Sequence, residues 1–166
     1  IGTSGSMQTD LPVGTMLASE IGIGMDTLMA YYPELVEDQS IAKAIQTVLK
    51  LPFLPYQASA SSLLLSKLDQ EVVNGVTLTC PGFYAPQGRQ LRLKAVDDKF
   101  LETLNELGVT NFEMETSAIY GLSKLLGHKA VTINNVIANR RRGEFSADHH
   151  QSEKNMIEWV LERVIK

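Results

Sequence analysis

The chain has 166 residues, of which 44% are hydrophobic and 20% are charged, and its formal net charge is −4. This length is enough for one domain with a buried core, while the acidic balance argues against a general nucleic-acid-binding protein. The single cysteine, Cys80, excludes an intrachain disulfide and a cysteine-rich zinc site and favours a reducing, cytoplasmic location. No apolar run approaches the length of a membrane span, so we expect neither a membrane nor nucleic acid as a partner.

The first six residues, Ile1-Gly2-Thr3-Ser4-Gly5-Ser6, predict the end of a strand that enters a glycine-rich turn. Glycines permit positive-φ turns in which successive N–H groups converge on an anion, and an ordinary strand-to-loop turn is the alternative. Because the chain opens directly on this motif, we expect that a natural N-terminal portion precedes it.

The segments that follow alternate between extended and helical patterns. We expect a strand over residues 14–21, a flexible loop over 21–26, a short helix over 61–68 and a buried strand over 76–80. The clearest helix starts at Ser40 and ends at Leu51-Pro52. Its apolar residues have the spacing of one buried helix face, and they are Ile41, Ala44, Ile45, Val48 and Leu49.

Residues 81–89 form a loop that is too rich in proline and glycine for regular structure. The Gln87 amide offers both a donor and an acceptor, the Arg89 guanidinium offers donors in a planar fork, and Phe83 offers a ring for stacking or packing. Together these groups can read the edge of a planar, amide-like base. A surface loop with a solvated arginine is the alternative.

Two helices are predicted on either side of residues 111–116. In the first, Asp97 is the N-cap, Val96 and Leu101 form a hydrophobic staple, and Gly108 is the C-cap. Its buried face consists of Phe100, Leu101, Leu104 and Leu107. The second helix covers residues 115–127, and its apolar side consists of Met114, Ala118, Leu122 and Leu125.

The segment Asn111-Phe112-Glu113-Met114-Glu115-Thr116 places two carboxylates just before a helix, and open α/β sheets bind ligands outside their strand ends. In an extended segment Glu113 and Glu115 point to the same side, and a carboxylate can accept both hydrogen bonds of a ribose 2′,3′-diol. Two simpler roles remain open. Glu113 can close a capping box with Thr110, and Glu115 can merely complement the helix dipole.

Residues 130–138 are nearly all apolar or small, as in a strand covered on both faces. Of the three arginines at 140–142, only Arg140 is close enough to the strand end for a functional role. The adjacent His149 and His150 are interpreted as loop residues rather than as two ligands of one metal.

A last helix, over residues 152–165, is predicted to bury Met156, Ile157, Val160, Leu161, Val164 and Ile165, with Trp159 off this stripe. Alternating helices and strands predict an α/β fold with a mixed central sheet flanked by helices.

Four stretches together resemble the nucleoside phosphorylase family, and specifically its uridine phosphorylase branch. They occur in family order, and they are Gly2-Thr3-Ser4-Gly5, Phe83-Tyr84-Ala85-Pro86-Gln87-Gly88-Arg89, Phe112-Glu113-Met114-Glu115-Thr116 and Val136-Ile137-Ala138-Asn139-Arg140. Residues 1–166 are therefore similar to the C-terminal portion of a single nucleoside phosphorylase domain. In the family a substantial N-terminal portion, which carries most of the phosphate-binding arginines, precedes the Gly2-Thr3 motif, and we expect the same portion ahead of Ile1 in the complete protein.

The resemblance implies a role for each matching residue. Thr3 would contact phosphate, and Ser4 and Gly5 would lie beside the base and ribose. Glu115 would bind the ribose hydroxyls, with Glu113 close by. The base would be held by one set of side chains, namely Phe83 packed against it, Gln87 and Arg89 on its carbonyl and imide edge, and Arg140 supporting that polar end. Apolar contacts would come from Met114 under the ribose and from Ile137 and Ala138 beside the base.

The implied reaction is phosphorolysis of uridine to uracil and ribose 1-phosphate, with Gln87, Arg89 and Glu115 as catalytic residues. Inorganic phosphate is the co-substrate, and neither an organic cofactor nor a metal is expected. The resemblance also implies a homo-oligomer built from dimers, because family sites are completed by a neighbouring subunit.

Two alternatives remain. Purine nucleoside phosphorylases and hydrolytic nucleosidases typically carry Ser-Asp at the end of the last strand, where this chain has Asn139-Arg140 and no aspartate before Asp148. A non-catalytic nucleoside-binding or oligomerisation module is the other alternative.

Overall fold

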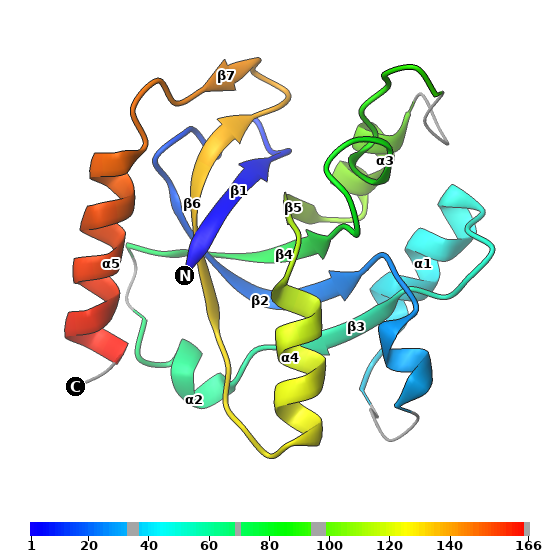
Figure 1. Cartoon of the computed structure of the whole chain (residues 1–166), viewed down its shortest axis with the longest axis horizontal. Helices are drawn as coiled ribbons and strands as arrows, with labels where there is room; N and C mark the ends of the chain where they lie inside the picture. The colour runs from blue at the N-terminus through cyan, green and yellow to red at the C-terminus, as the bar shows by residue number, and fades with distance from the viewer. Residues whose placement is uncertain (33–36, 69–70, 94–98, 165–166) are drawn as a thin grey trace.

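Strand β1 (Gly2–Ser6) lies inside a mixed seven-stranded sheet in a computed structural model that describes residues 1–32, 37–68, 71–93 and 99–164 (Figure 1). The order of the strands is β3-β2-β4-β5-β1-β6-β7. The other strands are β2 (Met16–Gly24), β3 (Tyr56–Ser59), β4 (Val73–Thr79), β5 (Val109–Glu113), β6 (Thr132–Asn139) and β7 (Glu144–Phe145). The helices are α1 (Ser40–Leu49), α2 (Ser62–Leu65), α3 (Phe100–Glu106), α4 (Thr116–Leu125) and α5 (His150–Val164), with short 3-10 helices η1 (Leu28–Tyr31) and η2 (Ala85–Gln87). The predicted α/β fold with a mixed sheet is confirmed.

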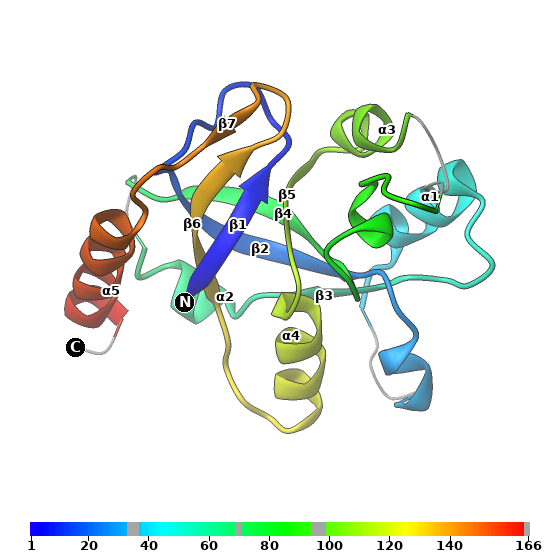
Figure 2. The same ribbon diagram turned by 45° about the horizontal axis from the view of Figure 1, so that its top comes forward.

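The sheet curls back on itself because β2 changes partner along its length. Residues 16–19 pair with β6, whereas residues 21–24 pair with β3, and the register of β2 against β4 shifts at Glu20 between these two halves. Such a bulge bends a strand. As a result β2, β4, β5, β1 and β6 form a closed ring of neighbours. In Figure 2, β1 and β6 rise together while β2 and β3 run across beneath them.

Two of the apolar clusters hold α1, α3 and α5 to this sheet. The larger one packs α1 and α3 against β2, β4 and β5, and its fully buried side chains include Ile23, Ile45, Leu78 and Leu104. The smaller one lies under α5 and consists of Ala18, Val72, Ile133, Met156, Trp159 and Val160. Full burial of one such aliphatic side chain stabilises the fold by about 1.5–3 kcal/mol, so these clusters fix the elements that frame the site.

Helix α4 buries a polar and small-residue face, and the predicted apolar side is wrong. Its buried residues are Thr116, Ser117, Tyr120 and Gly121. The reason is close packing on the sheet, because a Cβ at Gly22 of β2 would lie 3.1 Å from the Ser117 Cα. The Tyr120 hydroxyl completes this contact by donating to the Ser19 carbonyl and accepting from the Thr132 N–H, at 2.5 and 2.8 Å.

The buried faces of α1 and α5 are rotated from the predicted stripes. In α1 the buried residues are Ala42, Ile45 and Leu49, whereas Val48 is exposed. In α5 the exposed Ile157 and Leu161 were predicted to be buried, while Trp159 is buried and donates through its indole N–H to Glu71. Each face is set by the neighbour against which the helix packs, which apolar spacing alone does not identify.

Several predicted boundaries also change. Residues 2–6 are strand throughout, without a positive-φ glycine turn, and the expected loop at 21–26 is mostly the second half of β2. The predicted cap and staple residues Asp97 and Val96, and the terminal Ile165, lie outside the described residues. Gly108 has the positive φ of +79° expected of a C-cap. Among the described helices, none has the length and apolarity needed to cross a membrane.

Candidate functional site

One cavity of about 370 Å³ is lined by every residue that the sequence marked for the site. These residues are Thr3, Ser4, Gly5, Phe83, Gln87, Arg89, Glu113, Met114, Glu115, Ile137, Ala138 and Arg140. Two further aromatic residues, Phe112 and Phe145, also line it and were not marked. The only signal for Phe145 was an apolar residue soon after the arginine run, which is too weak to identify a cavity wall.

Strand β1 forms the floor of the cavity. It pairs antiparallel with β5 on one side and parallel with β6 on the other, so Gly5 lies opposite both Phe112 and Ala138. A register shift between Ser4 and Gly5 interrupts its pairing with β6, and bulges of this kind are common beside active sites. Ser4 is buried, yet its hydroxyl bonds to no other group in the described part of the chain.

The expectation that the site lies outside the strand ends holds only for part of it. The loop after β4, the Glu113–Glu115 segment at the end of β5 and Arg140 directly after β6 do lie at the carboxyl ends of their strands. Thr3 and Ile137, in contrast, lie within β1 and β6, and these two strands run antiparallel to β5. The cavity is therefore lined both by residues inside β1 and β6 and by residues at the ends of strands.

The loop at 81–89 is more ordered than its composition predicted, because Ala85–Gln87 form the 3-10 turn η2. Gly88 ends this turn with a φ of +67°, and a Cβ there would lie 2.5 Å from the Phe100 ring. Only glycine satisfies both demands without strain. The turn buries Gln87 and directs the chain so that the Arg89 guanidinium lies 4.2 Å from the centre of the half-exposed Phe83 ring.

Arg140 joins the end of β6 to this loop. Its Nη1 donates to the Gln87 backbone carbonyl, and its guanidinium lies 5.3 Å from the centre of the Phe112 ring. Burial, and then the neighbouring charge of Arg89, lower the pKa of Arg140 from its usual value. Two arginines thus concentrate positive charge at one end of the cavity.

Two carboxylates, Glu113 and Glu115, line the cavity where β5 meets α4. Glu113 is buried, and its Oε2 accepts the N–H groups of Glu115 and Thr116 at 2.8 and 2.7 Å. It therefore caps α4, although not through the predicted capping box, since the Thr110 hydroxyl donates to the Val76 carbonyl instead. Glu115 is the N-cap residue of α4 but makes no side-chain cap bond, and its exposed side chain lines the cavity.

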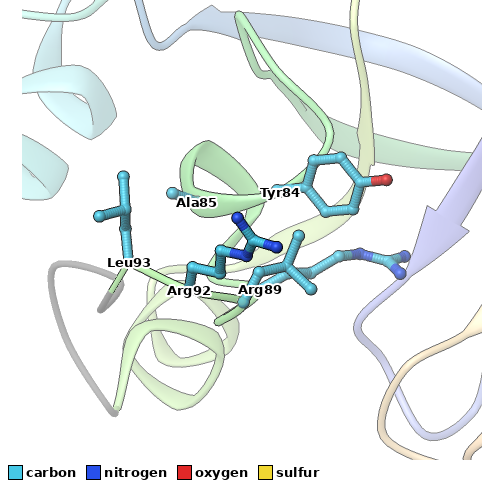
Figure 3. Close-up of a pocket in the computed structure, with 6 residues that line it drawn as sticks. Tyr84, Ala85, Arg89, Arg92 and Leu93 are labelled. Atoms are coloured by element: carbon cyan, nitrogen blue, oxygen red, sulfur yellow. The ribbon is translucent and has the colours of Figure 1, made fainter.

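A second, wider cavity of about 490 Å³ lies beside the loop after β4 (Figure 3). It is lined by Tyr84, Ala85, Arg89, Leu91, Arg92 and Leu93, all from one segment. Among the described residues that line it there is no carboxylate and no group from β1, β5 or β6. The candidate site is therefore the cavity over β1, where residues from four distant segments meet.

Within the described residues, one group has the chemistry to hold a metal ion. The ligand atoms of His149, His150 and Glu153 lie within 4.8 Å of one another, at the start of α5 and outside the cavity over β1. The interpretation of both histidines as loop residues is wrong for His150, which begins α5. None of the three belongs to the cavity lining, so the absence of a metal from the nucleoside reaction stays a prediction.

Comparison with known proteins supports the family that the sequence motifs resemble. The whole chain, residues 1–166, matches the Phosphorylase superfamily. The chain belongs to the nucleoside phosphorylase family. A nucleoside phosphorylase of Trypanosoma brucei, described as showing uridine phosphorylase activity, has a solved structure that superposes with a TM-score of 0.88 at 26% identity, covering 99% of this chain and 62% of that one.

The curated relatives of this chain include uridine phosphorylases and purine nucleoside phosphorylases. Uridine phosphorylase A of Schistosoma mansoni is 30% identical over 151 residues, covering 87% of this chain and 48% of the relative. A DeoD-type purine nucleoside phosphorylase of Aliivibrio fischeri is 32% identical over 102 residues, covering 60% of this chain and 39% of the relative. The chain spans about half the length of the uridine phosphorylases that it matches.

Proposed function

We propose that the complete protein catalyses phosphorolysis of a pyrimidine nucleoside, converting uridine and phosphate to uracil and ribose 1-phosphate. The observation that supports this most is the set of polar groups that line the cavity over β1. The Arg89 guanidinium, the Gln87 amide and the Glu115 carboxylate all belong to this one cavity. A uracil edge presents carbonyl acceptors and an imide donor, whereas a ribose presents hydroxyl donors. A nucleoside therefore offers partners to the hydrogen-bond donors and to the carboxylate of the same cavity.

The proposed chemistry needs no nucleophile from the protein. A phosphate oxygen forms a bond to C1′ of the ribose as the bond from C1′ to the base nitrogen breaks, and the electron pair of that bond leaves on the uracil ring. The sugar passes through an oxocarbenium-like state, as in glycoside cleavage. Donors from Gln87 and Arg89 stabilise the negative charge that develops on the base, which is electrostatic rather than covalent catalysis.

Cys80, which adjoins the site in sequence, does not offer an alternative covalent route. Burial, reinforced by the negative charge of Glu113, raises the pKa of the Cys80 thiol. A thiol rather than a thiolate is a poor nucleophile.

Thr3, which is exposed on β1 and lines the cavity, is the phosphate contact of this proposal. Further phosphate ligands, and the homo-oligomer built from dimers, belong to the proposal for the complete protein.

Uridine is proposed over purine nucleosides because of the end of β6. Asn139 is fully buried, donates its amide to the Gln8 and Leu11 carbonyls, and accepts the N–H groups of Arg141 and Arg142. The Asn139 side chain is therefore used in hydrogen bonds to the surrounding backbone. Asp148 is the first aspartate after Asn139, and an aspartate at this strand end is the group that assists a purine leaving group in the related enzymes. Its carboxylate accepts the His150 N–H and does not line the cavity.

We expect the complete protein to release uracil from uridine faster than hypoxanthine from inosine when both are supplied with phosphate. Chromatography of an equimolar mixture measures the two rates in one reaction. Faster release of hypoxanthine would overturn the base assignment, and no release of either base would favour the non-catalytic binding module.

A further inference from the structure

Resting on this proposed function, we propose that Thr79 is a positioning residue for the ribose end of the site. Its hydroxyl orients the Glu113 carboxylate, and that carboxylate in turn fixes the backbone from which the Glu115 side chain enters the cavity. Thr79 does not line the cavity itself.

The backbone of Glu115 is held from both sides. Its N–H donates to Glu113 Oε2, the N–H of Thr116 donates to the same oxygen, and its carbonyl accepts the N–H of Ile119 one helical turn later. We call the two hydrogen bonds from the Glu115 and Thr116 N–H groups to Glu113 Oε2 the clamp. The Glu115 side chain makes no cap bond of its own, so the position of its carboxylate depends on this clamp. Reactive geometry is lost when a supporting group is displaced by as little as about 1 Å.

The clamp is itself oriented by Thr79. Thr79 is the last residue of β4 and lies directly opposite Glu113 in the parallel pairing of β4 with β5. Its hydroxyl donates to Glu113 Oε1 at 2.5 Å and accepts the Ser117 N–H at 2.9 Å. All three residues are buried. One hydroxyl therefore ties together the end of β4, the end of β5 and the first turn of α4, with its donor and one acceptor position both used.

A matched control lies two residues earlier on the same strand. The Thr77 hydroxyl is also buried and also uses both functions, since it donates to Asn111 Oδ1 at 2.8 Å and bonds to the Ser19 hydroxyl at 2.6 Å. It makes no hydrogen bond to α4 or to the Glu113–Glu115 segment. Thr77→Val thus removes the same kind of buried hydroxyl from the same strand without touching the clamp.

The test compares the dissociation constants of uridine and 2′-deoxyuridine, measured by calorimetry without phosphate in the full-length protein. In Thr79→Val we expect uridine to bind about fivefold to tenfold more weakly, since a misplaced carboxylate loses part of a charged hydrogen bond. The dissociation constant of 2′-deoxyuridine should change less, because it lacks one of the hydroxyls that Glu115 binds. Thr79→Ser, which keeps the hydroxyl, should restore the wild-type ratio, and Thr77→Val should leave it unchanged.

Equal weakening of both ligands in Thr79→Val, or the same change of ratio in Thr77→Val, would overturn the inference. Thr79→Ala gives the same readout without placing an added methyl group beside the Glu113 carboxylate, which covers the case in which the valine variant does not fold. Binding is measured apart from turnover. A wild-type protein that binds uridine but releases no uracil therefore contradicts the proposed function and still tests the role of Thr79.

Discussion

Replacement of Arg89 by alanine is expected to lower kcat for uridine phosphorolysis by about 100-fold to 1,000-fold, the range found when one preorganised donor to a developing negative charge is removed. Arg89 lies against Phe83, and Arg140 lies beside it and raises the local positive charge. The loss should therefore appear in kcat, because the charge on the leaving base develops in the transition state. Steady-state kinetics on the full-length protein measure it.

Arg92 supplies the control for this substitution. It belongs to the same loop, is exposed, and lines only the second cavity. Arg92→Ala should leave kcat within about twofold of wild type, since surface changes away from a site have small effects. Arg89→Lys separates charge from shape, because lysine keeps the charge but loses the planar fork. Equal kinetics for Arg89→Ala and Arg92→Ala would remove Arg89 from the proposed mechanism.

Glu115→Gln is expected to lower turnover of uridine at least about tenfold, because hydrogen bonds to charged groups contribute on the order of 1.5–3 kcal/mol. The substitution keeps the shape of the side chain but removes the charge and one acceptor. The rate with 2′-deoxyuridine should fall less, since that substrate offers one hydroxyl fewer. Melting temperature should change little, because Glu115 makes no side-chain cap bond.

Glu102 in the first turn of α3 tests the simpler role for Glu115. It is an exposed first-turn carboxylate outside the cavity, so it shows what loss of a helix-dipole interaction alone does. Glu102→Gln should lower stability by roughly 0.3–1 kcal/mol without an effect on catalysis. If Glu115→Gln behaves in the same way, with wild-type kinetics and a lowered melting temperature, Glu115 does not bind ribose.

The residues predicted for a site all line one cavity, whereas the packing beneath that cavity was predicted less well, and the roles of these residues stay predictions. Phe83, Arg89, Glu115 and Arg140 were found because each lies in a short local pattern, and local patterns are visible without knowledge of the fold. The structure brings these four segments into one cavity. Neither the strand order nor the curl of the sheet at Glu20 could be read from such patterns, since both depend on pairing between distant residues.

The errors at α4 and at Glu113 come from contacts between segments that are distant in the sequence. Hydrophobic spacing identifies a buried face only where the buried residues are apolar. Helix α4 instead buries Thr116 and Ser117 because it approaches Gly22 closely, and it buries Gly121 against Met29. The hydroxyl that orients Glu113 comes from Thr79, which is 34 residues away in the sequence. A local capping box with Thr110 was the nearest partner that sequence spacing could suggest, and the parallel pairing of β4 with β5 provided a different one.

The identity of the sugar product tests the central proposal most directly. The full-length protein is incubated with uridine in phosphate buffer and in phosphate-free buffer, and ³¹P NMR follows the phosphate ester while chromatography follows uracil. We predict that ribose 1-phosphate appears in step with uracil, one molecule for each, and that uracil release stops without phosphate. Uracil release at the same rate in phosphate-free buffer, with free ribose as the sugar product, would contradict phosphorolysis and identify a hydrolytic nucleosidase.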